Sequence, residues 1–363
     1  MFVAWRDLKF AKGRFALMGT VIVLITLLVG LLSGLTAGLG RQNVSAITGL
    51  PAGRIAFAAP SGDQGLSYAN SIVTETQWRQ WAAVPGVVSA EPLGITTTKA
   101  TAGDRSAGVS VFGVRAGSVL APGSGKLTED AVVLSTKAAD DLRVQPGDGI
   151  VLAGRQLGVA AVSGDASFSH TPVVWTTLDV WRTTAPPGGT GDDPTATVIA
   201  LTTTTSDAVV AATDQAAGTR TVTKDDSLSA IGSYTSENGS LQLMRGFLFA
   251  ISALVIGAFF TVWTIQRSGD IAVLKALGAT TAGLLKDALG QAVVLLTGGT
   301  LIGTGLAAAL GAALAGTAIP FDLTPATVLV PAAVMVLLGA LGAALAIRRI
   351  TSVDPLTALG SAR

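Results

Sequence analysis

The chain has 363 residues, of which 49% are apolar and only 13% are charged. Soluble proteins carry about 25% charged residues, so this composition excludes an ordinary soluble enzyme. There is no cysteine and only one histidine. Disulfides, zinc–thiolate sites, iron–sulfur clusters and a histidine-based metal cluster are therefore excluded.

The apolar residues are concentrated in four runs without a charge, at residues 15–39, 246–265, 288–321 and 323–347. A helix needs about 20 apolar residues to cross the hydrocarbon core of a membrane. The first run is too long for a signal peptide and is not followed by a clear cleavage site, so we expect it to be retained. We predict a membrane protein with transmembrane helices at 15–40, 243–265, 288–315 and 327–347.

The charges between these runs predict the orientation. Residues 1–14, 266–287 and 348–363 together hold ten basic and four acidic residues, whereas the rest of the chain holds 14 basic and 19 acidic ones. Basic segments stay in the cytoplasm. We therefore expect a multi-pass protein of the cell membrane with both termini cytoplasmic and a short outer loop at 316–326.

Residues 41–242 differ from the rest because they are rich in Thr, Ser, Asp, Gly and Pro and contain short β-type runs. This segment can bury its own core, and we predict an extracytoplasmic α+β domain between helices 1 and 2. Trp78 and Trp81 share one face of a predicted helix, which indicates core packing. The segment 186–194 (PPGGTGDDP) reads as a loop. The predicted strands are 54–58, 87–97, 109–114, 131–134, 149–152, 157–162, 173–175 and 196–202, and the predicted helices are 75–83, 137–142 and 206–217.

Two features of the sequence resemble parts of binding sites, but neither has the residues that such a site requires. Gly123-Ser124-Gly125-Lys126 resembles a phosphate-binding loop, but Leu120 replaces its leading glycine and Leu127 its magnesium-binding hydroxyl residue. We interpret it as a turn. The only histidine, His170, lies in a polar loop and is read as a surface residue, since a metal site needs several ligands. No catalytic constellation is visible, so we do not expect an enzyme.

One cytoplasmic segment has a pattern suited to docking. Asp270 and Gly278 bracket a short helix, on which Ile271, Leu274 and Leu277 form one apolar stripe. Such a face can bind in the groove of a partner protein. The alternative is a simple connector, which would not require the stripe.

This segment, with Lys275 preceding Ala276-Leu277-Gly278-Ala279, resembles the coupling segment of the MacB/FtsX-type ABC transporter permeases. The tail is similar to that family's closing motif, with Arg348 and Arg349 followed by Asp354-Pro355 and Ala358-Leu359. The arrangement of one plus three helices around a large external domain is also the family's.

The resemblance implies a permease subunit of a type VII, MacB-like ABC efflux transporter. It implies a homodimer in membrane lipid with two copies of a separate ATPase subunit, to which Asp270, Ile271, Leu274, Lys275, Leu277 and Gly278 couple. ATP and magnesium would bind that partner subunit, and the chain itself would hold no cofactor and no nucleic acid. The permease would act by mechanotransmission.

Two further segments, 172–181 and 233–249, are similar to the haem-exporting branch of the family. Haem combines an apolar ring, two carboxylates and an iron that takes axial ligands. Glu237 and Met244 are candidate iron ligands, Tyr234 is a third, and apolar walls and cations lie nearby in the sequence. The predicted haem site consists of Arg41, Tyr234, Glu237, Met244, Arg245, Phe247 and Leu248.

Each of these residues also has an ordinary explanation. Tyr234 is a typical interfacial residue, Glu237 suits the start of a helix, Met244 suits packing and Arg245 suits a helix flank. Two other functions stay open: export of lipoproteins or antimicrobial peptides, and FtsX-like activation of a cell-wall hydrolase without transport. The hypothesis that we carry forward is haem export by ATP-driven squeezing of a dimeric cleft.

Overall fold

The computed structural model describes residues 12–185, 195–266, 269, 273, 278, 280–314, 317 and 319–351. Its contacts divide the chain into a membrane unit, Met1–Gly38 with Ser240–Arg363, and an external unit, Leu39–Gly239. The two units are described separately below. The predicted loop at 186–194 lies outside the described residues.

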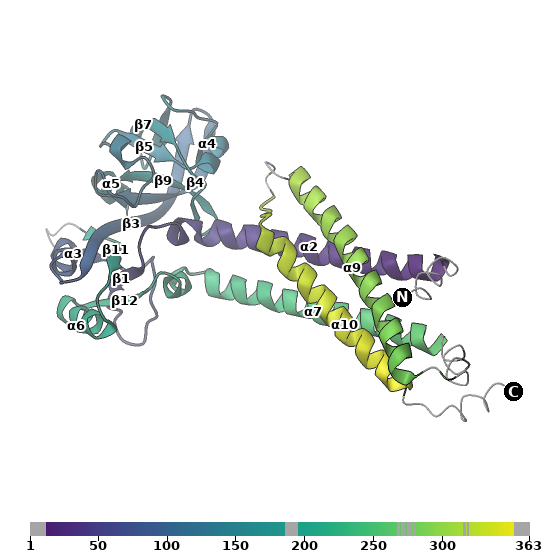
Figure 1. Cartoon of the computed structure of the whole chain (residues 1–363). Helices are drawn as coiled ribbons and strands as arrows, with labels where there is room; N and C mark the ends of the chain where they lie inside the picture. Colours follow the sequence, from purple (N-terminus) through teal and green to yellow (C-terminus); the bar gives the residue numbers. More distant parts are fainter. Residues whose placement is uncertain are drawn as a thin grey trace. The chain divides into compact units, whose positions relative to one another are not determined.

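Four long helices dominate the described part of the chain (Figure 1). They are α2 (Lys12–Thr48), α7 (Tyr234–Gln266), α9 (Thr281–Leu314) and α10 (Pro325–Thr351). Each contains an apolar stretch long enough to cross a membrane, which confirms the predicted class of four spans, one plus three. The predicted limits of the spans stay predictions, because a helix does not have to end at the membrane surface. Pro331 lies inside α10, and the helix continues past it.

The membrane unit is packed through small residues on α2 and α9. A side chain on Gly30 would lie 2.8 Å from the Cβ of Ala307 on α9, and one on Gly303 would lie 2.6 Å from the Val23 carbonyl of α2. Small residues allow helices to approach closely in a membrane. The Gly/Ala-rich stretch at residues 301–316 thus contributes Gly303 and Ala307 to the close packing of α9 against α2.

The external unit is built on a large mixed sheet in the strand order β12-β1-β11-β3-β4-β9-β5-β7-β6. Because β6 also pairs with β3, the strands from β3 to β6 close into a ring. The long strand β3 pairs with β11 through its first half and belongs to the ring through its second half. The strands are β1 (Arg54–Ala58), β2 (Val73–Thr74), β3 (Val87–Ala102), β4 (Arg105–Val114), β5 (Ala131–Leu134), β6 (Gly149–Leu152), β7 (Arg155–Val162), β8 (Ser167–Phe168), β9 (Thr171–Thr177), β10 (Thr195–Ala196), β11 (Val198–Thr203) and β12 (Thr219–Thr223).

Two cores fill the external unit. The first packs four short helices against the sheet, with Trp78 and Trp81 of α3 buried as predicted. The second contains the last turns of α2, through Ala46, Ile47 and Leu50, and the first residue of α7, Tyr234. The short helices are α3 (Glu75–Ala82), α4 (Thr136–Leu142), α5 (Leu178–Thr184) and α6 (Asp207–Ala217), with one-turn helices at Ser124–Lys126 and Asp226–Ala230.

The predicted α+β class is confirmed, but the element list was incomplete. Helix α5 and strands β2, β8 and β12 were missed. The predicted strand 196–202 is two strands, and the strand at 87–97 continues to Ala102. The sequence Gly123–Lys126 forms a turn, as predicted: Gly123 has a left-handed φ of 69° and a single 3-10 turn follows. Short strands without strict alternation are hard to recognise, because periodicity is the main signal for them.

Candidate functional site

Three side chains meet where α2 and α7 enter the external unit. The carboxylate Oε2 of Glu237, in the first turn of α7, lies 2.6 Å from Nε2 of His170 and 3.0 Å from Nδ2 of Asn43. Asn43, on α2, is only 2% exposed. The side chains of His170 and Glu237 are 35% and 42% exposed, so a molecule from outside can reach the pair.

His170 is carried by the tip of the hairpin between β8 and β9. Ser169 and His170 both have positive φ angles, 49° and 65°, a conformation that is uncommon for residues other than glycine. The backbone N–H of Ser169 donates to the Asn43 carbonyl at 2.9 Å, and that of His170 donates to the Gln42 carbonyl at 3.2 Å. The hairpin tip is thus fastened to the last turns of α2.

Aromatic packing and Ser45 fix the base of the same hairpin. Phe168 is buried, and its ring centroid lies 5.5 Å from that of Tyr68 and 5.6 Å from that of Phe112. Burial raises the pKa of the Tyr68 hydroxyl, which donates a hydrogen bond to Ser227 and stays neutral. The hydroxyl of Ser45 accepts a hydrogen bond from the backbone N–H of Ser167 at 2.9 Å. The position of His170 is therefore set by packing as well as by hydrogen bonds.

The other predicted haem residues of the external unit have different surroundings. Arg41 forms an ion pair with Asp165, with 2.8 Å between Nη2 and Oδ2. Tyr234 is partly buried against the second core. Arg41 is thus already paired with a carboxylate, and Tyr234 contributes mainly to packing.

The remaining predicted haem residues lie on α7 in the membrane unit. Met244 is 47% exposed and Phe247 is 60% exposed, whereas Leu248 packs against the core of the four helices. Arg245 is partly exposed. Along α7, Met244 and Phe247 belong to an exposed apolar stripe that a lipid or an apolar ligand can contact.

Sequence reasoning missed two residues of the cluster, Asn43 and His170. His170 was interpreted as a surface residue, and its exposure agrees with that, but its partner Glu237 is 67 residues away. The only signal in the sequence is that His170 is the single histidine of the chain, and histidine is a common metal ligand. Among the described residues no group of three or more His, Cys, Asp or Glu side chains is suited to hold a metal ion.

The predicted ATPase-coupling segment is described only in part. Asp270, Ile271, Leu274, Lys275 and Leu277 lie outside the described residues, whereas Gly278 is described and has a φ of 91°. A left-handed glycine is typical of the position just after a helix, where the sequence placed it.

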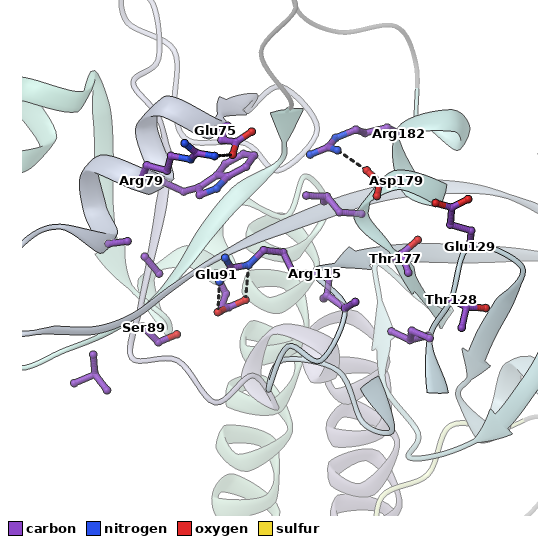
Figure 2. A pocket seen from close by; sticks show the side chains of 18 residues that line it. Glu75, Arg79, Ser89, Glu91, Arg115, Thr128, Glu129, Thr177, Asp179 and Arg182 are labelled. Carbon is purple, nitrogen blue, oxygen red and sulfur yellow. Dashed lines mark hydrogen bonds and ion pairs between the residues drawn. The ribbon is translucent and has the colours of Figure 1, made fainter. Parts of the chain in front are cut away.

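The external unit has an open groove of about 710 Å³ between α3, α5 and strands β3 and β4. Figure 2 shows three ion pairs in the groove, Arg79 with Glu75, Arg115 with Glu91, and Arg182 with Asp179, and the carboxylate of Glu129 beside them. The distance from Nη2 of Arg115 to Oε1 of Glu91 is 2.5 Å. Because each arginine of the groove is paired with a carboxylate, the groove is poorly suited to bind an anionic ligand.

Comparison with known proteins identifies the C-terminal third of the chain. Residues 243–355 match the family described as FtsX-like permease C-terminal. A protein of Staphylococcus haemolyticus named as a hemin transport system permease, HrtB, is 25% identical over 363 residues, which cover 99% of each chain. An uncharacterized ABC transporter permease of Mycobacterium tuberculosis is 25% identical over 375 residues, again with 99% of each chain covered.

Among solved structures, the periplasmic region of MacB from Actinobacillus actinomycetemcomitans covers 50% of this chain and 94% of its own, with a TM-score of 0.37 and 11% identity. The extracellular domain of YknZ from Gram-positive bacteria covers 47% and 97%, with a TM-score of 0.34 and 14% identity. The four apolar helices and the sequence matches show that the chain is an integral membrane protein whose C-terminal third is an FtsX-like permease domain, and that it is similar over its whole length to ABC transporter permeases.

Proposed function

We propose that the chain is the permease subunit of a haem exporter that works with a separate ATPase. The observation that carries this proposal is the similarity to the HrtB hemin permease over 99% of both chains. This match includes the external unit as well as the permease domain. The contact between Glu237 and His170 supports the proposal, because a carboxylate and an imidazole are both groups that can bind haem iron, and Glu237 lies in the first turn of α7.

The proposed working unit is a homodimer in the membrane with two ATPase subunits, which bind ATP and magnesium. Haem enters a cleft between helices α2 and α7 of the two copies from the lipid. Closure of the ATPase pair on ATP moves the segment 270–278, and the cleft is squeezed. A ligand can favour one of two states only through unequal affinity for them. Haem must therefore bind the open cleft more tightly than the squeezed cleft.

Within this proposal, the haem site takes its walls from Phe247 and Leu248 and its iron ligands from the residues around Glu237 and from Met244. Arg245 is a candidate partner for a propionate. Arg41 can take that role only by leaving Asp165. Tyr234 lines the same end of α7.

Two measurements test this function. Cells that lack the gene should become sensitive to haem, and the wild-type gene should restore growth, whereas a copy with Glu237→Ala and Met244→Ala should not. In the purified transporter, hemin should stimulate ATP hydrolysis. Stimulation by peptides or lipoproteins with no response to hemin would contradict haem export and favour the peptide or lipoprotein function. Activation of a cell-wall hydrolase without transport would favour the FtsX-like function.

A further inference from the structure

The contact between His170 and Glu237 determines which nitrogen of the histidine carries a proton. Oε2 of Glu237 accepts from Nδ2 of Asn43, because an amide nitrogen can only donate. A glutamate at neutral pH is ionised and can only accept. The hydrogen between Nε2 of His170 and Oε2 of Glu237 therefore belongs to the histidine.

A neutral imidazole with a proton on Nε2 has a free lone pair on Nδ1. Among the described residues, the His170 side chain forms its hydrogen bond with Glu237. The side chain is 35% exposed, so a ligand can approach the ring. A histidine that donates one ring N–H to a carboxylate while the other nitrogen binds a metal is a recurring arrangement in metal sites.

We propose that His170 is an axial ligand for the iron of the transported haem, and that Glu237 acts through it by holding the imidazole ring. This inference rests on the proposed function of haem export. Glu237 then becomes a positioning residue instead of a direct ligand.

The surroundings of His170 suit this role, because a ligand must be held in place before the metal arrives. The hairpin tip keeps two consecutive residues in left-handed conformations, and its backbone is tied to two carbonyls of α2. Phe168, next to the tip, is buried among aromatic rings. A surface loop without a function would not need this amount of support.

The binding experiment uses the full chain with its ATPase partner, purified without a histidine tag, so that His170 is the only histidine of the permease. Hemin is titrated in, and the reduced complex is examined by resonance Raman spectroscopy for an iron–imidazole stretching band. The main variant is His170→Asn, because asparagine tolerates a left-handed conformation. Ser169→Asn, at the neighbouring left-handed position, is the matched control.

The wild type and Ser169→Asn should both show the iron–imidazole band, and His170→Asn should lose it and bind hemin at least about tenfold more weakly. In Glu237→Gln the amide oxygen can still accept from the ring. The band should remain at a lower frequency, and the affinity should fall by about 10-fold to 100-fold, as for other carboxylates behind a metal-bound histidine.

Two results would overturn the proposal, and they can be told apart. If the wild type binds hemin and His170→Asn shows the same spectrum and affinity, His170 is not a ligand, while haem export still stands. If the wild type does not bind hemin at all, the proposed function fails and the inference fails with it. Melting curves of all variants exclude loss of folding as the cause of a lost band.

Discussion

The side-chain amide of Asn43 donates a hydrogen bond to the carboxylate of Glu237, although 194 residues separate them in the chain. Asn43 is buried and Glu237 is partly exposed, so the bond joins the last turns of α2 to the first turn of α7 at the edge of the core. Replacing the amide with a carboxylate, as in Asn43→Asp, would put two like charges in contact.

Asn43→Asp should therefore lower the stability of the external unit by about 1–3 kcal/mol, since a buried polar group would lose its partner. The full chain in detergent should melt at a lower temperature, and hydrogen exchange at residues 167–171 should become faster. Asn70→Asp is the control, because Asn70 is exposed. Equal melting temperatures for the two variants would show that the bond does not stabilise the junction.

A lysine stabilises the end of α2. Nζ of Lys224 donates to the carbonyl oxygens of Thr48 and Leu50, both at 2.9 Å. Cations near the last turn of a helix bind its unpaired carbonyls and oppose the helix dipole.

Lys224→Met should lower the free energy of unfolding by about 1–2 kcal/mol, because it removes two hydrogen bonds that a charged group donates. Lys99→Met changes an exposed lysine of β3 and should leave the melting temperature unchanged. A drop of the same size in both variants would mean that the effect comes from net charge and not from the helix end.

The packing of α2 in the membrane unit depends on the absence of a side chain at Gly34. A Cβ built there would overlap the ring of Phe321. At Gly19, on the same helix, a Cβ would have no neighbour within 4 Å.

Gly34→Ala should destabilise the protein by about 1–3 kcal/mol through overpacking, whereas Gly19→Ala should be neutral or slightly stabilising, since alanine favours a helix. Thermal melting in the same detergent compares the two. The double change Gly34→Ala with Phe321→Ala should recover part of the loss. If Gly34→Ala melts like Gly19→Ala, α2 is not packed against Phe321 in the membrane.

The apolar stripe of the segment 270–278 is predicted to contact the ATPase. Leu274→Glu and Leu277→Glu should each abolish the coupling, because a charged side chain cannot enter an apolar groove without a large desolvation cost. Hemin-stimulated ATP hydrolysis and co-purification of the ATPase should both be lost.

The control for this stripe is Val88→Glu, the same kind of change at a valine of β3 that is 72% exposed. It should leave both measurements as in the wild type. If haem export stays intact in Leu274→Glu and in Leu277→Glu, the segment 270–278 is a simple connector and does not dock on the ATPase.

The class of the fold could be predicted because length, charge and hydropathy determine it directly. Four uncharged runs are sufficient to predict four spans, and the polar segment between the first two must fold outside the lipid. The strand order could not be predicted, because the pairing of β3 with β6 joins residues about 50 positions apart. Nothing in the local pattern indicates such a pairing.

The site could be predicted only in part for the same reason. Glu237 could be singled out because a carboxylate is a possible ligand for haem iron and lies shortly before an apolar run. Its partners, Asn43 and His170, come from a helix and a hairpin far away in the sequence. Their contribution depends on tertiary contacts, which a single sequence does not contain.

Strand β3 has a consequence for movement within the external unit. Its side chains alternate between faces, so a shift by one position would turn every inward residue of the closed ring outward. A change of register along β3 is therefore strongly disfavoured. Because one continuous strand pairs with β11 and also belongs to the ring, we expect a displacement of β11 to be transmitted to the ring through β3.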